Sequence, residues 1–213
     1  MDKKNLENMN VIFATSNQGK INQVKEIFKL NNVLLNIKSE KEINFNEEVV
    51  EDGKTFEENS KIKALTLKQF CDKNEIKYDM ILADDSGICV DALNGEPGVY
   101  SARYAGKNKT SQEKLDFILN KMKRYKTSDE RKAHFVSVIT AIFKDGKLIQ
   151  TRGECNGHLA DHYNVICRLT YNPIFIPEGF DKPIGEMSEE EFKNVHNHRE
   201  IALRKLFDLL YEM

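Results

Sequence analysis

The sequence of 213 residues predicts an α/β protein built as one folding unit. Three observations support this prediction: strand-like runs alternate with helical patterns in the first half, two alternating runs flank a tight turn in the second half, and a helical pattern closes the chain. A chain of this length can bury one sizeable core. No repeat, low-complexity tract or long linker interrupts it. We therefore expect a single domain over residues 1–213.

The first half begins with a strand, a loop and a helix. Residues 10–15, NVIFAT, form a β-branched and aromatic run. Apolar residues then follow at helical spacing, at Ile21, Val24, Ile27 and Phe28. A weaker strand is expected at 33–37, and an acidic loop separates it from a helix that begins near Thr55. A second apolar strand is predicted at 80–85, MILADD.

The second half contains a β-meander between two helices. Gly and Pro at 94–98 mark a loop, and residues 111–122 have helical spacing. Asp145-Gly146 lies between two strand-like runs, which is the usual signal of a tight hairpin. The last helix is expected from about Glu200, with one apolar face formed by Ile201, Leu203, Leu206, Leu209 and Leu210.

Charge and composition exclude several classes of function. The 32 basic and 34 acidic side chains give a net charge of −2, so no chain-wide positive field exists to hold a nucleic acid polymer. No apolar run approaches the roughly 18 residues that span a bilayer, and the polar start lacks the apolar stretch of a signal peptide. We therefore expect a cytoplasmic protein without a membrane partner. The cysteines show no CxxC spacing, which favours free thiols.

The first cluster that could carry chemistry is Thr15-Ser16-Asn17-Gln18-Gly19-Lys20, where a strand passes into a helix. Unpaired backbone N–H groups at a helix start bind phosphate, and Lys20 would add a full charge. The alternative is a simple N-cap, which Thr, Ser and Asn all favour. The spacing leaves both open.

The second cluster is Asp84-Asp85-Ser86-Gly87, at the end of the second apolar strand. Two adjacent carboxylates are costly there unless a cation compensates for them, and magnesium binds carboxylates and substrate phosphates. The alternative is a polar turn. Glu58 could supply a further carboxylate, although Thr55 and Glu58 also have the spacing of a capping box.

The third cluster lies just before the last helix, at Lys193 and at His198-Arg199. Its positive side chains could meet a phosphate or the edge of a base. A solvated charge run is the alternative. The spacing of His196 and His198 raises zinc as a further possibility, which the contexts of the other histidines do not support.

Together these stretches resemble the inosine triphosphate pyrophosphatase family of non-canonical purine nucleoside triphosphate pyrophosphatases. The resemblance runs nearly end to end, and its longest block is highly specific. The stretches that carry it are FATSNQGK at 13–20, TFEENSKIKA at 55–64, ADDSGICVDALNGEPGVYSARYAG at 83–106, YNPIF at 171–175 and KNVHNHR at 193–199.

The resemblance implies an elongated mixed central sheet flanked by helices, with two lobes, a nucleotide cleft between them and a homodimer. It implies magnesium-dependent hydrolysis of (d)ITP- or XTP-type purine nucleoside triphosphates to the monophosphate and pyrophosphate, as nucleotide-pool sanitation. In the family pattern, Glu58 and Asp85 bind magnesium and Asp85 is also the general base. The substrate contacts would be Thr15, Ser16, Asn17, Gln18, Gly19, Lys20, Ser86, Leu169, Thr170, Tyr171, Asn172, Lys193, His198 and Arg199.

The chain departs from the family pattern at the base end of the expected site. Family members usually read GFGYDP and SHR, where this chain has Leu169 for the stacking aromatic, Asn172 for the aspartate and Asn197 for the serine. The departures concern the preferred base rather than the reaction. A nucleotide sensor on the same fold, which binds without turnover, is an alternative class of function. An RNA-binding or structural protein is a third class, for which the sequence offers no basic surface or aromatic platform.

Overall fold

The computed structural model describes residues 9–31, 33, 35–167 and 169–212. Its six-stranded sheet has the strand order β2-β1-β3-β4-β5-β6. The strands are β1 (Asn10–Ala14), β2 (Asn36–Ser39), β3 (Met80–Val90), β4 (Lys132–Phe143), β5 (Leu148–Leu159) and β6 (Phe175–Pro177). The α-helices are α2 (Gln18–Leu30), α3 (Phe56–Lys73), α4 (Ser111–Lys121), α5 (Glu189–Phe192) and α6 (His198–Tyr211).

The sheet is mixed, which confirms the predicted fold class. Strand β1 pairs in parallel with both β2 and β3, and β5 pairs antiparallel with β6. The predicted hairpin is present, with Asp145-Gly146 at its turn between β4 and β5.

The chain divides into two compact units. The first comprises residues 1–85, 137–153 and 199–213, and the second comprises residues 86–136 and 154–198. Strands β3, β4 and β5 each contribute residues to both units. The single-domain organisation stays a prediction.

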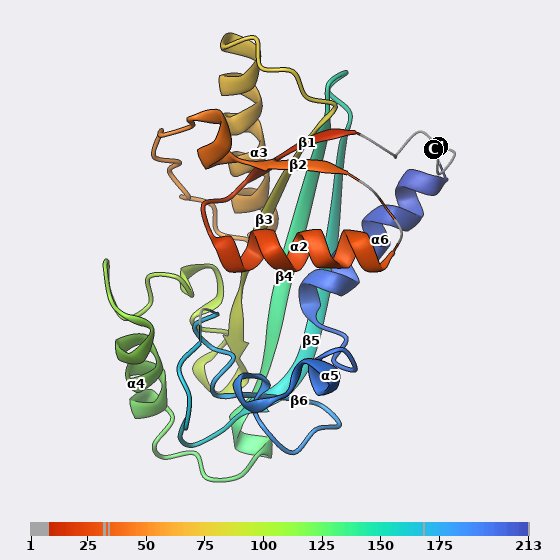
Figure 1. Ribbon diagram of the computed structural model, residues 1–213. Helices are drawn as coiled ribbons and strands as arrows, with labels where there is room; N and C mark the ends of the chain where they lie inside the picture. The colour runs from red at the N-terminus through yellow and green to blue at the C-terminus, as the bar shows by residue number, and fades with distance from the viewer. Residues whose placement is uncertain (1–8, 32, 34, 168, 213) are drawn as a thin grey trace. The chain divides into compact units, whose positions relative to one another are not determined.

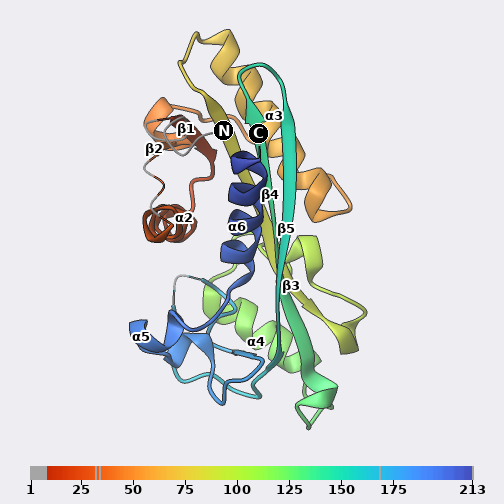
Figure 2. The same cartoon turned by 90° about the vertical axis from the view of Figure 1, so that its right-hand side faces the viewer.

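In the first unit, helices cover both faces of the sheet (Figures 1 and 2). Alternate residues of a strand point to opposite faces. Val11 and Phe13 of β1 pack in one core cluster with apolar residues of α2 and α6. Ile12 and Ala14 pack in another with apolar residues of α3. The sheet therefore lies between α2 and α6 on one side and α3 on the other.

The second unit has its own core. Ile88 and Val90, at the end of β3, pack there with Leu115 and Ile118 of α4 and with Phe175 of β6. These two strand residues explain why β3 is longer than the predicted strand at 80–85: its alternation continues past the polar residues into a second core. Asp84 and Asp85 therefore lie within a strand and not at its end.

Two further details differ from the sequence-based expectations. Strand β2 spans Asn36–Ser39, and Asn36 pairs with Asn10, the first residue of β1; position 34 of the strand expected at 33–37 lies outside the described residues. On α6, Leu209 is exposed and Phe207 is buried. Leu203, Leu206, Phe207 and Leu210 follow the i, i+3, i+4, i+7 spacing of one helical stripe, and Leu209 falls outside it.

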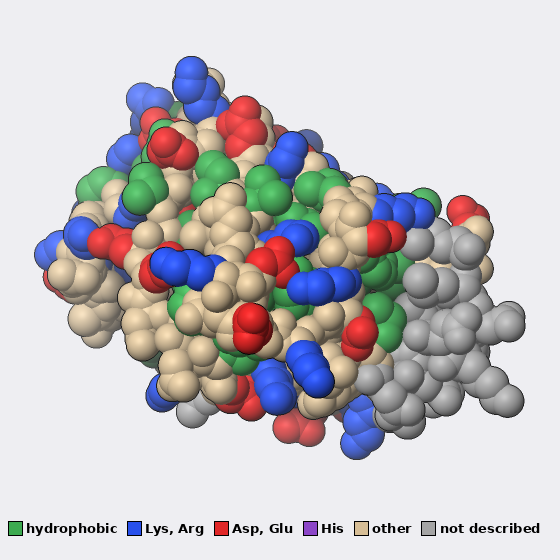
Figure 3. Space-filling model, turned by 90° about the horizontal axis from the view of Figure 1, so that it is seen from above, with side chains coloured by type: hydrophobic (Ala, Val, Ile, Leu, Met, Phe, Trp, Pro, Cys, Tyr) green, Lys and Arg blue, Asp and Glu red, His purple; other side chains and the backbone are tan. Residues whose placement is uncertain are grey.

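The mixed surface charge and the free cysteines are as the composition and the cysteine spacing indicated. Figure 3 shows acidic and basic side chains interspersed over the described part of one face. Among the residues that the structure describes, no helix is long and apolar enough to cross a membrane. All four cysteines are free, as expected: Cys71, Cys89, Cys155 and Cys167.

Candidate active site

The turn from β1 into α2 positions the first predicted cluster. Asn17 caps α2, and its Oδ1 accepts hydrogen bonds from the backbone N–H groups of Gly19 (2.9 Å) and Lys20 (3.3 Å). Thr15 Oγ1 accepts in turn from the Asn17 N–H at 3.1 Å. Gln18 donates to Asn22, one turn along the helix. The N-cap interpretation is thus confirmed, and phosphate binding at this helix start stays a prediction.

Asp84 is buried and lies at the centre of a charged network. Its carboxylate accepts from Lys20 Nζ at 2.8 Å, from Ser137 Oγ at 2.6 Å, and from Arg199 Nε and Nη2 at 3.2 and 3.0 Å. Burial alone would raise the pKa of Asp84, but the charges of Arg199 and Lys20 outweigh it and hold that pKa far below its usual range. Burial lowers the pKa of Lys20. Asp84 is therefore an ionised anchor for two cationic side chains.

Asp85 is also buried, at 5% exposure, but its two oxygens differ. Oδ1 accepts from Lys63 Nζ at 2.7 Å. Oδ2 is buried and has no hydrogen-bond partner within the described part of the chain. Burial raises the pKa of Asp85, and the charge of Lys63 offsets part of that rise. Since buried polar atoms are normally paired, this oxygen is where a ligand or a water molecule would be held.

Lys63 and Glu51 complete the cluster, and neither was singled out from the sequence. Lys63 Nζ lies 3.2 Å from Glu51 Oε2 and donates to the Asp84 carbonyl at 3.2 Å. Burial alone would lower the pKa of Lys63, but the neighbouring charges of Asp85 and Glu51 raise it. One signal was present in the sequence: Lys63 follows Phe56 by seven residues and precedes Leu67 by four, which puts it on the apolar stripe of a helix, where a lysine needs an acidic partner.

Glu58 forms the capping box that its spacing allowed, and metal binding by Glu58 stays a prediction. Its Oε2 accepts from the backbone N–H groups of Lys54 (2.5 Å) and Thr55 (3.2 Å), while Thr55 Oγ1 accepts from the Glu58 N–H at 3.1 Å. One residue further along, Asn59 Oδ1 accepts from the Gly53 N–H at 2.9 Å. The start of α3 therefore anchors the segment that leads from Glu51.

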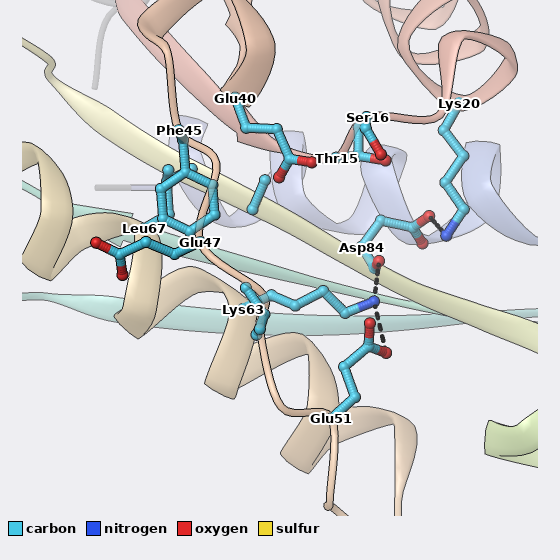
Figure 4. A pocket seen from close by; sticks show the side chains of 12 residues that line it. Thr15, Ser16, Lys20, Glu40, Phe45, Glu47, Glu51, Lys63, Leu67 and Asp84 are labelled. Atoms are coloured by element: carbon cyan, nitrogen blue, oxygen red, sulfur yellow. Dashed lines mark hydrogen bonds and ion pairs between the residues drawn. The ribbon is translucent and has the colours of Figure 1, made fainter.

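Four of these groups, Lys20, Glu51, Lys63 and Asp84, line a cavity of about 200 Å³ in the first unit, and Asp85 adjoins it through its contact with Lys63 (Figure 4). In Figure 4, Lys20 reaches Asp84, Lys63 reaches Glu51, and the Glu40 carboxylate points toward Thr15 and Ser16. The cavity is lined by two basic residues, Lys20 and Lys63, and by four acidic residues: Glu40, Glu47, Glu51 and Asp84. The lining is completed by Ala14, Thr15, Ser16, Phe45, Val49 and Leu67.

The carboxylate oxygens at and beside the cavity suit a hard cation such as magnesium better than zinc. Among the described residues, no three His, Cys, Asp or Glu side chains are grouped closely enough to hold a metal by themselves. Glu51 lines the cavity, and Asp85 Oδ2 has no partner within the described ranges. The two carboxylates fit a cation that takes one or two carboxylates and completes its shell with phosphate and water oxygens, as magnesium does. The histidine pair that raised zinc has no such support, and the His198 ring stacks on Phe135, with 4.8 Å between ring centroids.

Most of the residues predicted to contact the base belong to the second unit. Tyr171 is buried in the core, and its hydroxyl donates to the Ser101 carbonyl at 2.9 Å. Asn172 is half-buried, and its backbone is bonded on both sides, to the Leu169 carbonyl and the Gly185 N–H. Ser86, Leu169 and Thr170 are half-buried as well, and Lys193 is exposed.

Arg199 belongs to the first unit and is almost fully buried. Besides Asp84, its guanidinium donates to Gln23 of α2. The structure thus joins the start of α6 to α2 and β3, an arrangement that no pattern in the sequence indicated. Contact with a base stays a prediction for Arg199.

Comparison with known proteins gives a consistent result. A model of the Ham1 family matches residues 11–209. A protein from Clostridium perfringens (strain 13 / Type A) named dITP/XTP pyrophosphatase is 40% identical over 200 residues, 93% of this chain and 96% of the relative. One of the same name from Bacillus subtilis (strain 168) is 37% identical over 199 residues, 93% of this chain and 96% of the relative. The solved structure of the Staphylococcus aureus Ham1 protein has a TM-score of 0.78 at 34% identity, covering 94% of this chain and 97% of its own.

Proposed function

The chain belongs to the Ham1 family, and from this premise we propose that it hydrolyses dITP- and XTP-type purine nucleoside triphosphates to the monophosphate and pyrophosphate. The names of the relatives from Clostridium perfringens and Bacillus subtilis support the substrate class. The cavity of the first unit, where two lysines and a helix start meet four acidic side chains, supports the reaction type. Such an enzyme would remove aberrant nucleotides before a polymerase uses them.

The observation that carries the proposal is the buried Oδ2 of Asp85, which has no hydrogen-bond partner among the residues that the structure describes. A general base needs a free lone pair within hydrogen-bond reach of the proton that it takes. Its neighbour Asp84 is already bonded to Lys20, Ser137 and Arg199. Of the two carboxylates, Asp85 is therefore the one suited to orient and deprotonate the water that attacks the α-phosphorus.

The residues around the β1–α2 turn would hold the triphosphate. The start of α2 presents the positive end of the helix dipole. Lys20 lies beside it in the cavity lining with Thr15 and Ser16, and Ser86 follows Asp85 in β3. Asn17, Gln18 and Gly19 complete the predicted phosphate contacts. Lys20 would share its charge between Asp84 and the phosphates.

The charges of the cavity support a need for a divalent cation, for which we propose Mg²⁺. Four acidic residues against two lysines already line the cavity, and a triphosphate brings several further negative charges. Asp85 and Glu51 would hold the ion, with Glu51 in place of Glu58, because Glu58 is engaged in the capping box. The ion would supply neutralisation of the phosphate oxygens.

The base would be read by residues around 169–172 and at the start of α6. Leu169, Thr170, Tyr171 and Asn172 are proposed to contact it, together with Lys193, His198 and Arg199. We also propose that the protein acts in the cytoplasm as a homodimer. The test for the dimer is the mass of the purified protein by light scattering: a mass equal to that of one chain overturns it.

Product analysis tests the reaction directly. Purified protein is incubated with dITP, XTP, GTP and ATP, with and without Mg²⁺, and pyrophosphate and orthophosphate are assayed separately. Pyrophosphate and the monophosphate are the expected primary products, with release that depends on Mg²⁺. Orthophosphate and a diphosphate as primary products would overturn the cleavage position, and nucleotide binding without turnover would identify a sensor.

A further inference from the structure

Lys63 occupies a position between the two carboxylates proposed for the metal. We propose that Lys63 is a positioning residue that pairs Glu51 with Asp85 and competes with a divalent cation for them. This inference rests on the proposed function, because it concerns the same carboxylates. It adds a residue that sets the affinity for the cation rather than one that binds it.

The contacts of Lys63 leave its ammonium fully engaged. It donates to Asp85 Oδ1 at 2.7 Å and to the Asp84 carbonyl at 3.2 Å, and it lies 3.2 Å from Glu51 Oε2. Three acceptors match the three donors of an ammonium group. With only 13% of its side chain exposed, Lys63 is held in place by these contacts and not by solvent.

Electrostatics makes this position both useful and competitive. Two carboxylates that share one neighbour repel each other when both are ionised, and the Lys63 charge lets Glu51 and Asp85 approach the same point. A cation bound through Asp85 Oδ2 and Glu51 would lie close to that same ammonium. Like charges about 4 Å apart in a partly buried site repel strongly, and the repulsion doubles for a divalent ion. Lys63 must therefore weaken cation binding even as it shapes the site.

Removal of the Lys63 charge should have two opposite effects. The affinity for the cation rises because a competitor and a repelling charge are lost. Turnover falls because Asp85 loses the hydrogen bond that orients its carboxylate. A residue with a purely structural role would lower both, so the split between them is specific to the proposal.

Binding of Mn²⁺ to the nucleotide-free protein tests the first effect by electron paramagnetic resonance titration. For Lys63→Met we expect affinity about tenfold tighter than wild type, from the lost repulsion. Lys63→Arg keeps the charge and should show no tightening. Lys68→Met is the matched control, since Lys68 lies on the same helix but pairs with Asp72 at 2.6 Å. Lys63→Gln, which keeps a hydrogen-bond donor without the charge, replaces Lys63→Met if that variant does not fold.

Unchanged or weaker Mn²⁺ affinity in the uncharged variants overturns the competition, as does tightening of equal size in Lys68→Met. Pyrophosphate release by the wild-type protein is measured separately. Turnover by the wild type together with unchanged affinity in Lys63→Met would overturn only the role of Lys63. Tighter Mn²⁺ binding in that variant without any turnover by the wild type would support the role of Lys63 and overturn the proposed function.

Discussion

Asp84 and Asp85 are adjacent in β3, yet their side chains have opposite surroundings. Asp84 is bonded to two cationic side chains and a hydroxyl, which hold its pKa far below its usual range despite burial. Asp85 keeps one buried oxygen without a partner among the described residues, and burial raises its pKa. Alternation along a strand separates the two groups, so one carboxylate is an anchor and the other is suited to chemistry.

Asp85→Asn should preserve the fold and lower kcat by about a hundredfold or more, the usual effect of losing a general base. The amide keeps the size of the side chain but cannot take the proton. Steady-state pyrophosphate release and thermal unfolding measure the two effects. Asp161→Asn, at an exposed aspartate of the second unit, serves as the control. Near wild-type turnover in Asp85→Asn would remove this residue from the mechanism.

Asp84→Asn should instead destabilise the protein by about 3–5 kcal/mol at neutral pH, because it leaves Lys20 and Arg199 buried without their counter-charge. The pKa of Asp84 is lowered by folding, so its contribution is present above the unfolded pKa and is lost as pH falls. The stability difference between wild type and variant should thus shrink below about pH 4. Urea unfolding at several pH values measures it, and a difference that stays constant down to pH 3 would contradict an ionised Asp84.

Glu51→Gln and Glu58→Gln separate metal binding from helix capping. Glu51→Gln should raise the Mg²⁺ concentration needed for half-maximal activity, since it deletes an anionic ligand. Glu58→Gln should lower stability by only about 0.3–1 kcal/mol, because its amide oxygen can still accept the capping hydrogen bonds while the charge at the helix N-terminus is lost, and should leave the Mg²⁺ requirement unchanged. Magnesium titrations of pyrophosphate release and thermal melts measure the two quantities. A raised requirement in Glu58→Gln alone would restore the assignment suggested by the family resemblance.

At the scale of elements, the start of α3 holds the segment that carries Glu51. The capping box at Thr55 and Glu58 and the bond from Gly53 to Asn59 fix residues 51–55 against the helix. Glycine is required at position 53 because atoms of Glu58 and Asn59 lie too close to leave room for a side chain. A Cβ at this position would lie 2.6 Å from Asn59 Oδ1, 2.7 Å from Glu58 Cβ and 3.0 Å from the Asn59 nitrogen.

Gly53→Ala should therefore displace this segment and, with it, Glu51. We expect a raised Mg²⁺ requirement and a lower melting temperature, with overpacking costs of about 1–3 kcal/mol. Lys54→Ala changes the neighbouring exposed residue and should alter neither. Magnesium dependence equal to wild type in Gly53→Ala would show that the packing of this segment does not determine the metal site.

The elements also show how far sequence reasoning reaches. Helix α2 and its cap were predictable because local side chains determine both: the apolar spacing from Ile21 and the preference of Asn17 for the N-cap. The junction of Glu51, Lys63 and Asp85 was not predictable, because it depends on how a loop, a helix and a strand pack together. The position of Arg199 against Asp84 has the same origin, since the two residues meet only through tertiary structure.

For the whole molecule, the order of most elements followed from alternating strand and helix patterns, whereas the mixed sheet was implied only by the family resemblance. The division into two units did not follow from those patterns, because β3, β4 and β5 each run through both of them without a break in pattern. Length and composition indicated one folding unit, and the core around Ile88 and Leu115 shows that a second cluster formed within the same chain. The local sequence patterns also do not determine which nucleotide base the proposed enzyme prefers.

The preference for ITP over ATP should be less than about a hundredfold in kcat/KM, because Asn172 stands where the family pattern has aspartate. A carboxylate near the six-position only accepts hydrogen bonds, whereas an amide both donates and accepts, so Asn172 tolerates the adenine edge. An unpaired polar group in a pocket costs about 1–3 kcal/mol. Asn172→Asp should therefore increase the preference for ITP roughly ten- to a hundredfold.

Asn172→Asp should change the side chain without disturbing the local backbone. The Asn172 backbone is bonded at both its N–H and its carbonyl, so the change is confined to the side chain. The measurement is kcat/KM for ITP and ATP in both proteins, with Asn156→Asp as the control for added charge at an exposed site of the same unit. His198 and Arg199 can donate to a six-oxo group and so favour ITP in either variant. A wild-type preference above about a hundredfold that Asn172→Asp leaves unchanged would assign selection of the base to those two residues and not to Asn172.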